Sequence, residues 1–499
     1  MTRAADTIPL PYAGPATTTT SADVDRRVAW LLFIGSLLVY AYFFQGQGYN
    51  QNAQLDTIRA IVERQTFEIT AFARPGGPLT FTGDIYDVNG RVFSNKPPGM
   101  AIVGAPVYAI LAGVERAMGL SLNDLAVVRF NAYVLAVVLS ALPGAWVVVA
   151  MYRHLRDNGF DPPTSSLAAA GLAFGTLLFP YAGVLMAHNL LAACLFVPWT
   201  WITRRTVSIR RATLAGLLVG VGVATFLPVA PVAALYPIEL LRRRLTRQAI
   251  AFCAGPALTV VGMLAYNAHH YGSPFETGAR IGGEPFYEAR LLLGYFDVPD
   301  FRRLYWISIH PFRGLFYSCP LFILCLLSLL KPDRAWLRSN VIPALIVGWF
   351  ILFYLTFNGW AGGFSVGPRY AIPALPFLLL FALPAMQRYR GLAIALVALS
   401  TINMLALTAY NVMAPGNSVG PALNEDPVAE SFKRMTMNWV ARSSESYNLG
   451  MRVGIKGVPS IIPAVAMLGA FFYFLRRLTS EAPSKPSSAA PNGRLGSSR

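Results

Sequence analysis

The stretch Ser94-Asn95-Lys96-Pro97-Pro98-Gly99 closes a long polar segment that begins at Gln45 and separates two apolar segments of the chain. A proline pair is tolerated in the first turn of a helix, where the backbone N–H groups have no intrahelical partner. The pair therefore predicts a helix start, with Lys96 at the membrane surface directly before it. An ammonium group beside unpaired N–H groups suits a phosphate. The plainer alternative is an ordinary helix start with a lysine whose charged end reaches into water.

The composition of the chain is that of an integral membrane protein. Hydrophobic residues make up 55% of the 499 residues, charged residues make up 13%, and the mean hydropathy is +0.48. Because a membrane-spanning helix needs about 20 mainly apolar residues, the sequence predicts an all-α polytopic membrane protein with about 12 transmembrane helices. The apolar stretch 97–117 remains outside this set. The predicted spans are 28–44, 125–152, 165–181, 186–203, 212–228, 229–241, 248–267, 313–330, 341–357, 369–385, 391–410 and 454–475.

The basic residues decide the predicted topology. A net charge of +17 can indicate nucleic-acid binding. Here, however, the basic clusters fall in short loops and at segment ends: Arg153/Arg156, Arg204/Arg205/Arg210/Arg211, Arg242/Arg243/Arg244/Arg247, Lys331/Arg334/Arg338, Arg388/Arg390 and Arg476/Arg477. If every predicted span crosses and 97–117 does not, all these clusters lie on one side, which the positive-inside rule makes cytoplasmic. We therefore expect cytoplasmic termini, long loops outside, an interfacial or re-entrant helix at 97–117 and no nucleic-acid partner.

The predicted organisation is one transmembrane domain, 28–479, between two disordered cytoplasmic tails, 1–27 and 480–499. No cleavage site follows the first apolar segment, which we expect to remain as an anchor. The four cysteines lie in apolar segments without metal-ligand spacing. Four long outer loops are expected, at 45–124, 268–312, 358–370 and 411–453.

Three of these outer loops are candidates for a site. The first begins with a predicted surface helix, Asn52–Thr66, and continues through turns. The second carries His269-His270, which have no partners at metal spacing. The third is glycine-rich, which allows a close approach of the backbone to a ligand. Besides Lys96, the charged and aromatic candidates in these loops are Asp84, Asp87, Arg280, Arg369 and Tyr370.

Several motifs together resemble bacterial members of the GT-C superfamily of glycosyltransferases, which includes aminoarabinose transferase and the protein O-mannosyltransferases. The resemblance covers residues 28–385 and implies a GT-C-like fold with interfacial helices in the first outer loop. The residues that carry it are the surface helix Leu55-Asp56-Thr57-Ile58-Arg59-Ala60-Ile61-Val62-Glu63, the element Lys96-Pro97-Pro98, the span opening Val128-Arg129-Phe130-Asn131, the short helix pair from Phe179-Pro180-Tyr181 to His188-Asn189, and the late element Gly367-Pro368-Arg369-Tyr370.

The resemblance implies that a sugar, a hexose or a pentose, is moved from a polyprenyl phosphate to an acceptor hydroxyl. The reaction would take place on the outer, periplasmic face of a bacterial cytoplasmic membrane. The leaving phosphate needs cations, for which Lys96, Arg129 and Arg369 are candidates. Expected partners are membrane lipids, the polyprenyl-phosphate sugar and an envelope glycan, glycolipid or protein acceptor. No cofactor is firmly implied and no metal site is predicted, although a divalent cation stays open.

The sequence departs from the family at the catalytic carboxylate. The position of the usual Asp is Asn50 or Gln51, and His188 takes the place of a second Asp. For the general base that an acceptor hydroxyl needs, Asp56 is the first choice and Asp84 the second. His188 is a third candidate for a catalytic role. Asp87, Arg280 and Tyr370 are candidates for substrate contacts.

Plainer alternatives stand beside each of these roles. Asp56 could face water, Asp84 and Asp87 could be turn residues, His188 could be a core histidine, and Arg129 could extend its charge toward water. Two other functions stay open for the whole chain: a lipid or sugar transporter or flippase, and a catalytically silent relative that binds glycolipid. Transporters often show inverted repeats and charges at the middle of the membrane. The chain has no visible repeat, which favours an enzyme at the membrane surface.

Overall fold

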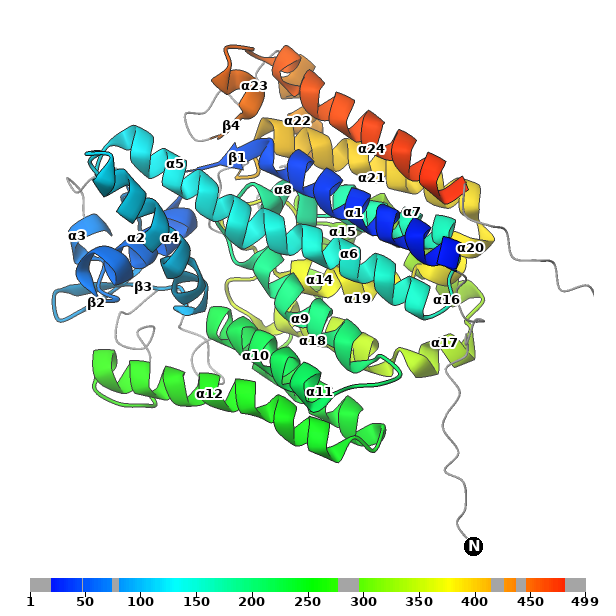
Figure 1. Cartoon of the computed structure of the whole chain (residues 1–499), viewed down its shortest axis with the longest axis horizontal. Helices are drawn as coiled ribbons and strands as arrows, with labels where there is room; N and C mark the ends of the chain where they lie inside the picture. The colour runs from blue at the N-terminus through cyan, green and yellow to red at the C-terminus, as the bar shows by residue number, and fades with distance from the viewer. Residues whose placement is uncertain are drawn as a thin grey trace, which may run out of the picture.

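The computed structural model describes residues 19–46, 48–73, 80–276, 296–413, 426–436 and 446–480, and within them the chain is almost entirely helical. A layer of long helices runs lengthwise through the molecule (Figure 1). Its members are α1 (Thr19–Ala41), α5 (Leu125–Ala136), α6 (Leu142–Asp157), α21 (Arg390–Tyr410) and α24 (Ile462–Ser480). A π-helical turn, Val137–Ala141, joins α5 to α6. Helix α1 packs against both α6 and α24.

The middle of the chain forms a second group of helices behind this layer. They are α7 (Pro162–Phe174), α8 (Leu178–Ala182), α9 (His188–Ile202), α10 (Ile209–Thr225), α11 (Ala230–Arg242) and α12 (Thr246–Tyr271). Helix α9 is buried along nearly its whole length between α6 and α10. It therefore lies in the core, whereas α12 touches mainly α10 and α11 and leaves most of its surface exposed.

The remaining helices are short and follow one another closely. They are α14 (Arg302–Ser308), α15 (Leu315–Ser318), α16 (Ile323–Leu330), α17 (Arg334–Ser339), α18 (Val341–Thr356), α19 (Leu375–Leu380), α20 (Leu383–Arg388), α22 (Pro427–Thr436) and α23 (Leu449–Arg452). Short 3₁₀ turns interrupt them at Leu227–Val229, Pro320–Phe322, Arg369–Ala374 and Val458–Ile461. Prolines cause several of these breaks, because proline lacks the N–H that a continuing helix needs.

The segment predicted as the first outer loop folds into a compact cap. It contains α2 (Tyr49–Arg64), α3 (Thr70–Ala73), the hairpin strands β2 (Ile85–Val88) and β3 (Arg91–Ser94), and α4 (Gly99–Ala117). Figure 1 shows this cap at one end of the molecule, with α4 running across the direction of α6. Strand β1 (Phe43–Gln45), directly after α1, pairs antiparallel with the distant strand β4 (Ser446–Asn448).

Five helical segments of the described chain are long and apolar enough to cross a membrane: Gly99–Ala117, Leu125–Asp157, Thr246–Tyr271, Arg390–Tyr410 and Val458–Ser480. Four further apolar helices are shorter: His188–Ile202, Pro320–Leu330, Val341–Thr356 and Arg369–Leu380. The prediction of an all-α polytopic membrane protein is confirmed. The prediction of twelve spans stays a prediction.

Two predicted boundaries are wrong. Helix α1 begins at Thr19, so part of the predicted disordered tail 1–27 is helical. The reason is an anchor in the tail itself, because the Asp25 carboxylate accepts hydrogen bonds from Arg156 Nε at 2.8 Å and from Tyr152 Oη at 2.6 Å. The last span was predicted at 454–475, whereas α24 runs from Ile462 to Ser480 after the 3₁₀ turn.

The close packing of α10 on α12 depends on glycine. A Cβ atom placed on Gly216 would lie 1.9 Å from the Phe252 carbonyl oxygen, and one on Gly255 would lie 2.1 Å from the Gly216 carbonyl carbon. Backbones can approach this closely only where both helices lack side chains, as is common between membrane helices. This contact holds α12, which has few other neighbours, against the molecule.

Helix α4 packs lengthwise against α2. Gly104 lies against Ile58, since a Cβ atom on this glycine would be 2.7 Å from Ile58 Cδ1. One turn further along, Tyr108 Oη donates to Glu63 Oε1 at 2.6 Å. Beyond the end of α4, Asn123 Oδ1 accepts from Arg59 Nη2 at 2.7 Å. The apolar face predicted for the surface helix, including Leu55 and Ile58, is therefore buried against α4.

Candidate functional site

The hairpin of the first outer loop brings Asp84 to Lys96. Because Ile85 pairs with Ser94, the residues just outside the two strands lie side by side. Lys96 Nζ lies 2.9 Å from Asp84 Oδ2, and each side chain keeps about a quarter of its surface exposed, 23% and 26%. The polar pair at the end of this hairpin is therefore open to a ligand.

A two-residue turn sets the register of this hairpin. Asn89 and Gly90 both have positive φ values, 54° and 80°. This is the conformation of a type I′ turn, for which Asn-Gly is the preferred sequence. An Asn-Gly dipeptide between two short segments of alternating apolar and polar residues is a sequence signal for such a hairpin. The pairing of Asp84 with Lys96 could have been predicted from it, but was not.

The Lys96-Pro97-Pro98 element is seated on the end of α10. A Cβ atom on Gly99 would lie 2.4 Å from the Ala224 carbonyl carbon, so only glycine allows this approach. Phe226 follows directly after α10, and its ring stacks on that of Tyr370 at 5.9 Å between centroids and 4° between planes. The element predicted from the sequence to bind phosphate thus lies near Tyr370, the last residue of the Gly-Pro-Arg-Tyr segment.

Arg369 points into the same region. Its Nη1 lies 3.6 Å from Met186 Sδ and its Nη2 donates to Tyr370 Oη at 3.3 Å. It forms no ion pair within the described residues, although the Asp84 carboxylate is near enough to stabilise its charge. Gly362, at φ +76°, leaves room for the guanidinium, because a Cβ atom there would lie 3.0 Å from Arg369 Nε. A cation without a carboxylate partner is available for an anionic ligand.

His188, at the first position of α9, lies within electrostatic reach of the two cations. The charges of both Lys96 and Arg369 act on its ring. The ring meets those of Tyr181 at 5.4 Å and Tyr370 at 5.9 Å, each edge to face. Four separate parts of the chain therefore meet in one place. We call Asp84, Lys96, His188, Arg369 and Tyr370 the outer cluster.

A buried arginine holds the glycine-rich loop of the outer cluster. Arg313 is only 2% exposed. Its Nε donates to the Ala361 carbonyl at 2.9 Å and its Nη2 to the Gly363 carbonyl at 2.8 Å, while its guanidinium lies over the Phe312 ring. Our sequence analysis missed this role, because Arg313 stands at the edge of a predicted span.

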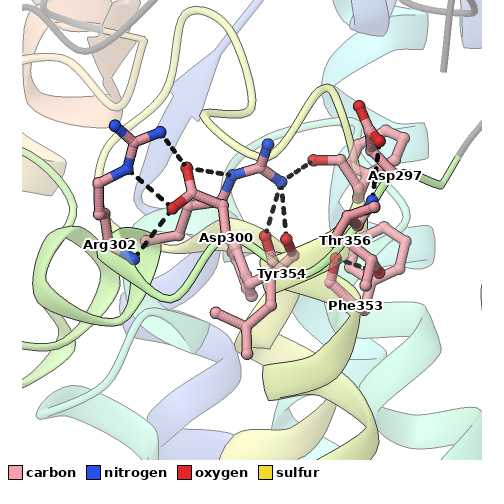
Figure 2. Close-up of polar contacts among 10 residues, drawn as sticks. Asp297, Asp300, Arg302, Phe353, Tyr354 and Thr356 are labelled. Atoms are coloured by element: carbon pink, nitrogen blue, oxygen red, sulfur yellow. Dashed lines mark hydrogen bonds and ion pairs between the residues drawn. The ribbon is translucent and has the colours of Figure 1, made fainter. Parts of the chain in front are cut away.

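A second arginine fixes the end of α18, as Figure 2 shows around Asp300 and Tyr354. Arg303 Nη1 donates to the carbonyls of Tyr354, Leu355 and Phe357 at 2.8 to 3.3 Å. The hydrogen bond from Arg302 holds the pKa of the partly buried Asp300 carboxyl below its usual value. Tyr354 Oη in turn accepts from the Tyr370 N–H at 2.8 Å, which links this support to the outer cluster.

Asp56 lies in α2 and, among the described residues, forms no ion pair or hydrogen bond with a member of the outer cluster. Its side chain is fully buried. Burial raises the pKa of Asp56 to about 8, although the Thr80 hydroxyl and the Arg59 charge both act in the opposite direction. The carboxyl is therefore mostly protonated at neutral pH. Close by, Arg59 and Glu63 form an ion pair at 2.8 Å that belongs to the contact between α2 and α4.

Two other predicted residues, Arg129 and Asp87, lie outside the outer cluster. The positive charge of Arg129 lies close enough to Tyr447 to interact with its phenol group, and the Tyr447 ring meets that of Phe44 at 4.9 Å. No described interaction links Arg129 to Lys96 or Arg369. Asp87 accepts from the Gly90 N–H in the hairpin turn at 2.8 Å. Arg280 lies outside the described residues. In the described part of the chain, no three His, Cys, Asp or Glu side chains gather as a metal site would require.

No protein-family model matches this chain, and no curated protein sequence does either. Solved structures do match. The structure resembles ArnT. With ArnT from Cupriavidus metallidurans bound to undecaprenyl phosphate the TM-score is 0.47 at 15% identity, over 93% of this chain and 78% of ArnT. With the apo state the values are 0.46 and 17%, over 92% and 76%. At this distance no residue's role is carried over from ArnT.

Proposed function

We propose that this protein is a glycosyltransferase of the cytoplasmic membrane of a bacterium. It transfers a hexose or pentose from a polyprenyl-phosphate donor to a hydroxyl of an envelope glycan, glycolipid or protein on the outer face. The observation that carries the proposal is that two cations, Lys96 and Arg369, both lie within electrostatic reach of His188, and that Lys96 is paired with the Asp84 carboxylate. In the sequence these residues are far apart, so their meeting is a property of the fold.

The chemistry of the outer cluster fits a phosphate leaving group. As the sugar leaves, negative charge develops on the phosphate oxygens, and fixed cations in a partly dry site stabilise that charge. Lys96 and Arg369 supply two such cations. Arg369 can also form two parallel hydrogen bonds to a phosphate. The aromatic rings of Tyr370 and Phe226 lie next to them and keep part of the site dry.

Asp84 is the carboxylate that we assign as general base. Bound to Lys96, it is held as a hydrogen-bond acceptor and is not free to take a proton. A donor phosphate on Lys96 would replace Asp84 there and release its carboxylate toward the acceptor hydroxyl. General-base catalysis of this kind contributes roughly 10²–10⁴ in rate. Asp56, the first choice from the sequence, stays the competing assignment and is tested beside Asp84.

Binding of undecaprenyl phosphate to the purified protein tests the cation pair. We expect Lys96→Ala and Arg369→Ala each to weaken binding roughly tenfold or more, since a hydrogen bond to a charged group contributes about 1.5–3 kcal/mol. Arg116→Ala, which removes an exposed cation from the last turn of α4, is the matched control and should leave binding unchanged. Equal affinity of wild type and both cluster variants would contradict the proposal.

Arg129→Ala extends the same measurement to the third predicted cation. Arg129 acts on Tyr447 and not on the outer cluster. We therefore expect a weaker effect than for Lys96→Ala. A loss as large as that of Lys96→Ala would return Arg129 to the phosphate site that the sequence analysis predicted.

A further inference from the structure

A cavity of about 350 Å³ lies at the end of the molecule opposite the cap. Helices α16, α17 and α20 form it, and Figure 1 shows them beside the start of α1 and far from α2 and α4. This is the end that the basic clusters assign to the cytoplasm. The polar and aromatic residues that line it include Phe160, Lys331, Asp333, Trp336, Gln387 and Arg388.

The cavity carries an excess of positive charge. Lys331 and Arg388 both line it, and neither forms an ion pair with any carboxylate in the described residues. The lining has one carboxylate, Asp333, whose Oδ1 accepts from the N–H groups of Ala335 and Trp336 at 2.9 and 3.0 Å. Because Asp333 caps the start of α17, its charge is directed at the helix and not at the two cations.

One wall of the cavity is apolar and rigid. The rings of Phe160 and Trp336 meet edge to face at 5.3 Å. Trp336 Nε1 donates to the Leu380 carbonyl at 3.0 Å, which fixes the indole in place. A ligand in this cavity would therefore have its anionic part at Lys331 and Arg388 and an apolar part against the two rings.

The helix before Lys331 shows where the membrane boundary lies. Leu326, Leu329 and Leu330 on α16 are 48%, 60% and 76% exposed, which suits contact with lipid chains. The next residue is Lys331, so the cavity opens where the hydrocarbon region gives way to the headgroup region. The phosphate of a phospholipid lies at this level of the membrane, whereas a soluble anion would bind equally well in a cavity far from the lipid.

We propose that this cavity binds the phosphate of an anionic phospholipid from the cytoplasmic leaflet. Lys331 and Arg388 hold the phosphate, and the Gln387 amide is a further hydrogen-bond donor in the lining. The aromatic wall receives the glycerol and the first part of an acyl chain. The site is separate from the outer cluster and does not depend on the proposed transfer reaction.

Native mass spectrometry of the purified full chain tests the proposal, with phosphatidylglycerol and phosphatidylcholine as probes. We expect wild type to retain phosphatidylglycerol in preference to phosphatidylcholine. The double variant Lys331→Ala/Arg388→Ala should lose this preference, with roughly tenfold or more weaker retention, because it removes both charge-assisted hydrogen bonds to the phosphate. The matched control Arg210→Ala/Arg211→Ala removes the same charge from the start of α10 and should behave as wild type.

Two results would overturn the proposal. One is equal retention of phosphatidylglycerol by wild type and the Lys331/Arg388 double variant, provided that both melt at the same temperature. The other is competition by soluble glycerol phosphate at the concentration at which the lipid binds, which would assign the cavity to a free phosphate. If the double variant melts lower, Lys331→Gln/Arg388→Gln removes the charges with less loss of packing and decides the result.

Discussion

Asp84 and the donor phosphate compete for the same lysine, because Lys96 binds Asp84 in the structure and is proposed to hold the phosphate. Asp84→Asn should therefore change two measurements in opposite directions. Freed of the carboxylate, Lys96 should bind undecaprenyl phosphate several-fold more tightly. Without a base, transfer should fall roughly 10²-fold or more. Weaker binding together with unchanged transfer would contradict both parts of this role. Asp56→Asn is the matched comparison and should leave phosphate binding unchanged.

Asp56 should instead make the stability of the protein depend on pH. Its pKa is about 8 in the folded chain and lies near 3.8 when the carboxyl is exposed. Between these values the unfolded state has lost a proton that the folded state retains, so the free energy of unfolding falls as pH rises and levels off above pH 8. Thermal melting in detergent from pH 4 to 9 should show this fall in wild type. It should be reduced in Asp56→Asn, and identical profiles would contradict the assignment.

At the residue scale the sequence named all five residues of the outer cluster as candidates but did not predict their contacts. Lys96, His188, Arg369 and Tyr370 stood out because charged or aromatic groups at helix starts in apolar chains are unusual. Their meeting depends on backbone approaches at Gly99 and Gly362 that no local pattern encodes. Arg313 was missed because its partners are backbone carbonyls, which leave no trace in the sequence.

At the scale of elements, the glycine contact between α10 and α12 predicts that two glycine-to-alanine variants change the stability of the protein in different ways. Gly216→Ala places a methyl group against the Phe252 carbonyl and should cost roughly 1–3 kcal/mol of stability, or several degrees of melting temperature. Gly262→Ala, also on α12, has no atom within 4 Å of the added carbon. It should be neutral or slightly stabilising, because alanine favours helix more than glycine. Equal melting of the two variants would exclude the close contact.

The position of α4 is the second prediction at this scale. Helix α4 is long and apolar enough to cross, yet its contacts with Ile58 and Glu63 align it along α2. We therefore expect it to stay on the outer side. In a variant without native cysteines, Ser121→Cys should react with a membrane-impermeant thiol reagent added from outside. Thr206→Cys should react only after the membrane is opened. Protection of Ser121→Cys from outside would place half of the basic clusters on the outer face.

Helix positions were predictable because apolar runs, basic ends and prolines mark them directly. The start of α1 could not be predicted in this way, because it depends on the hydrogen bonds of Asp25 with Arg156 and Tyr152, two residues that are distant from Asp25 in the sequence. The hairpin was also missed, although the Asn89-Gly90 turn marks it.

The whole molecule has a different chemistry at each end. The cap and the outer cluster lie at one end, and the cationic cavity beside α16 and α17 lies at the other (Figure 1). The distribution of basic residues predicted this polarity from the sequence. It did not predict the cavity, because Lys331 and Arg388 meet only through the packing of α16 against α20. The pairing of β1 with β4 was not predicted either, because it joins two strands that lie about 400 residues apart in the sequence.

The most direct test of the central claim is mass spectrometry of envelope lipids and glycans from a strain that lacks this protein. The account predicts one glycan, glycolipid or glycoprotein that has lost a single sugar, restored by wild type and by Arg116→Ala. Lys96→Ala and Asp84→Asn, inserted at wild-type levels, should not restore it. An envelope of unchanged composition, or full restoration by both cluster variants, would contradict a transferase acting through the outer cluster.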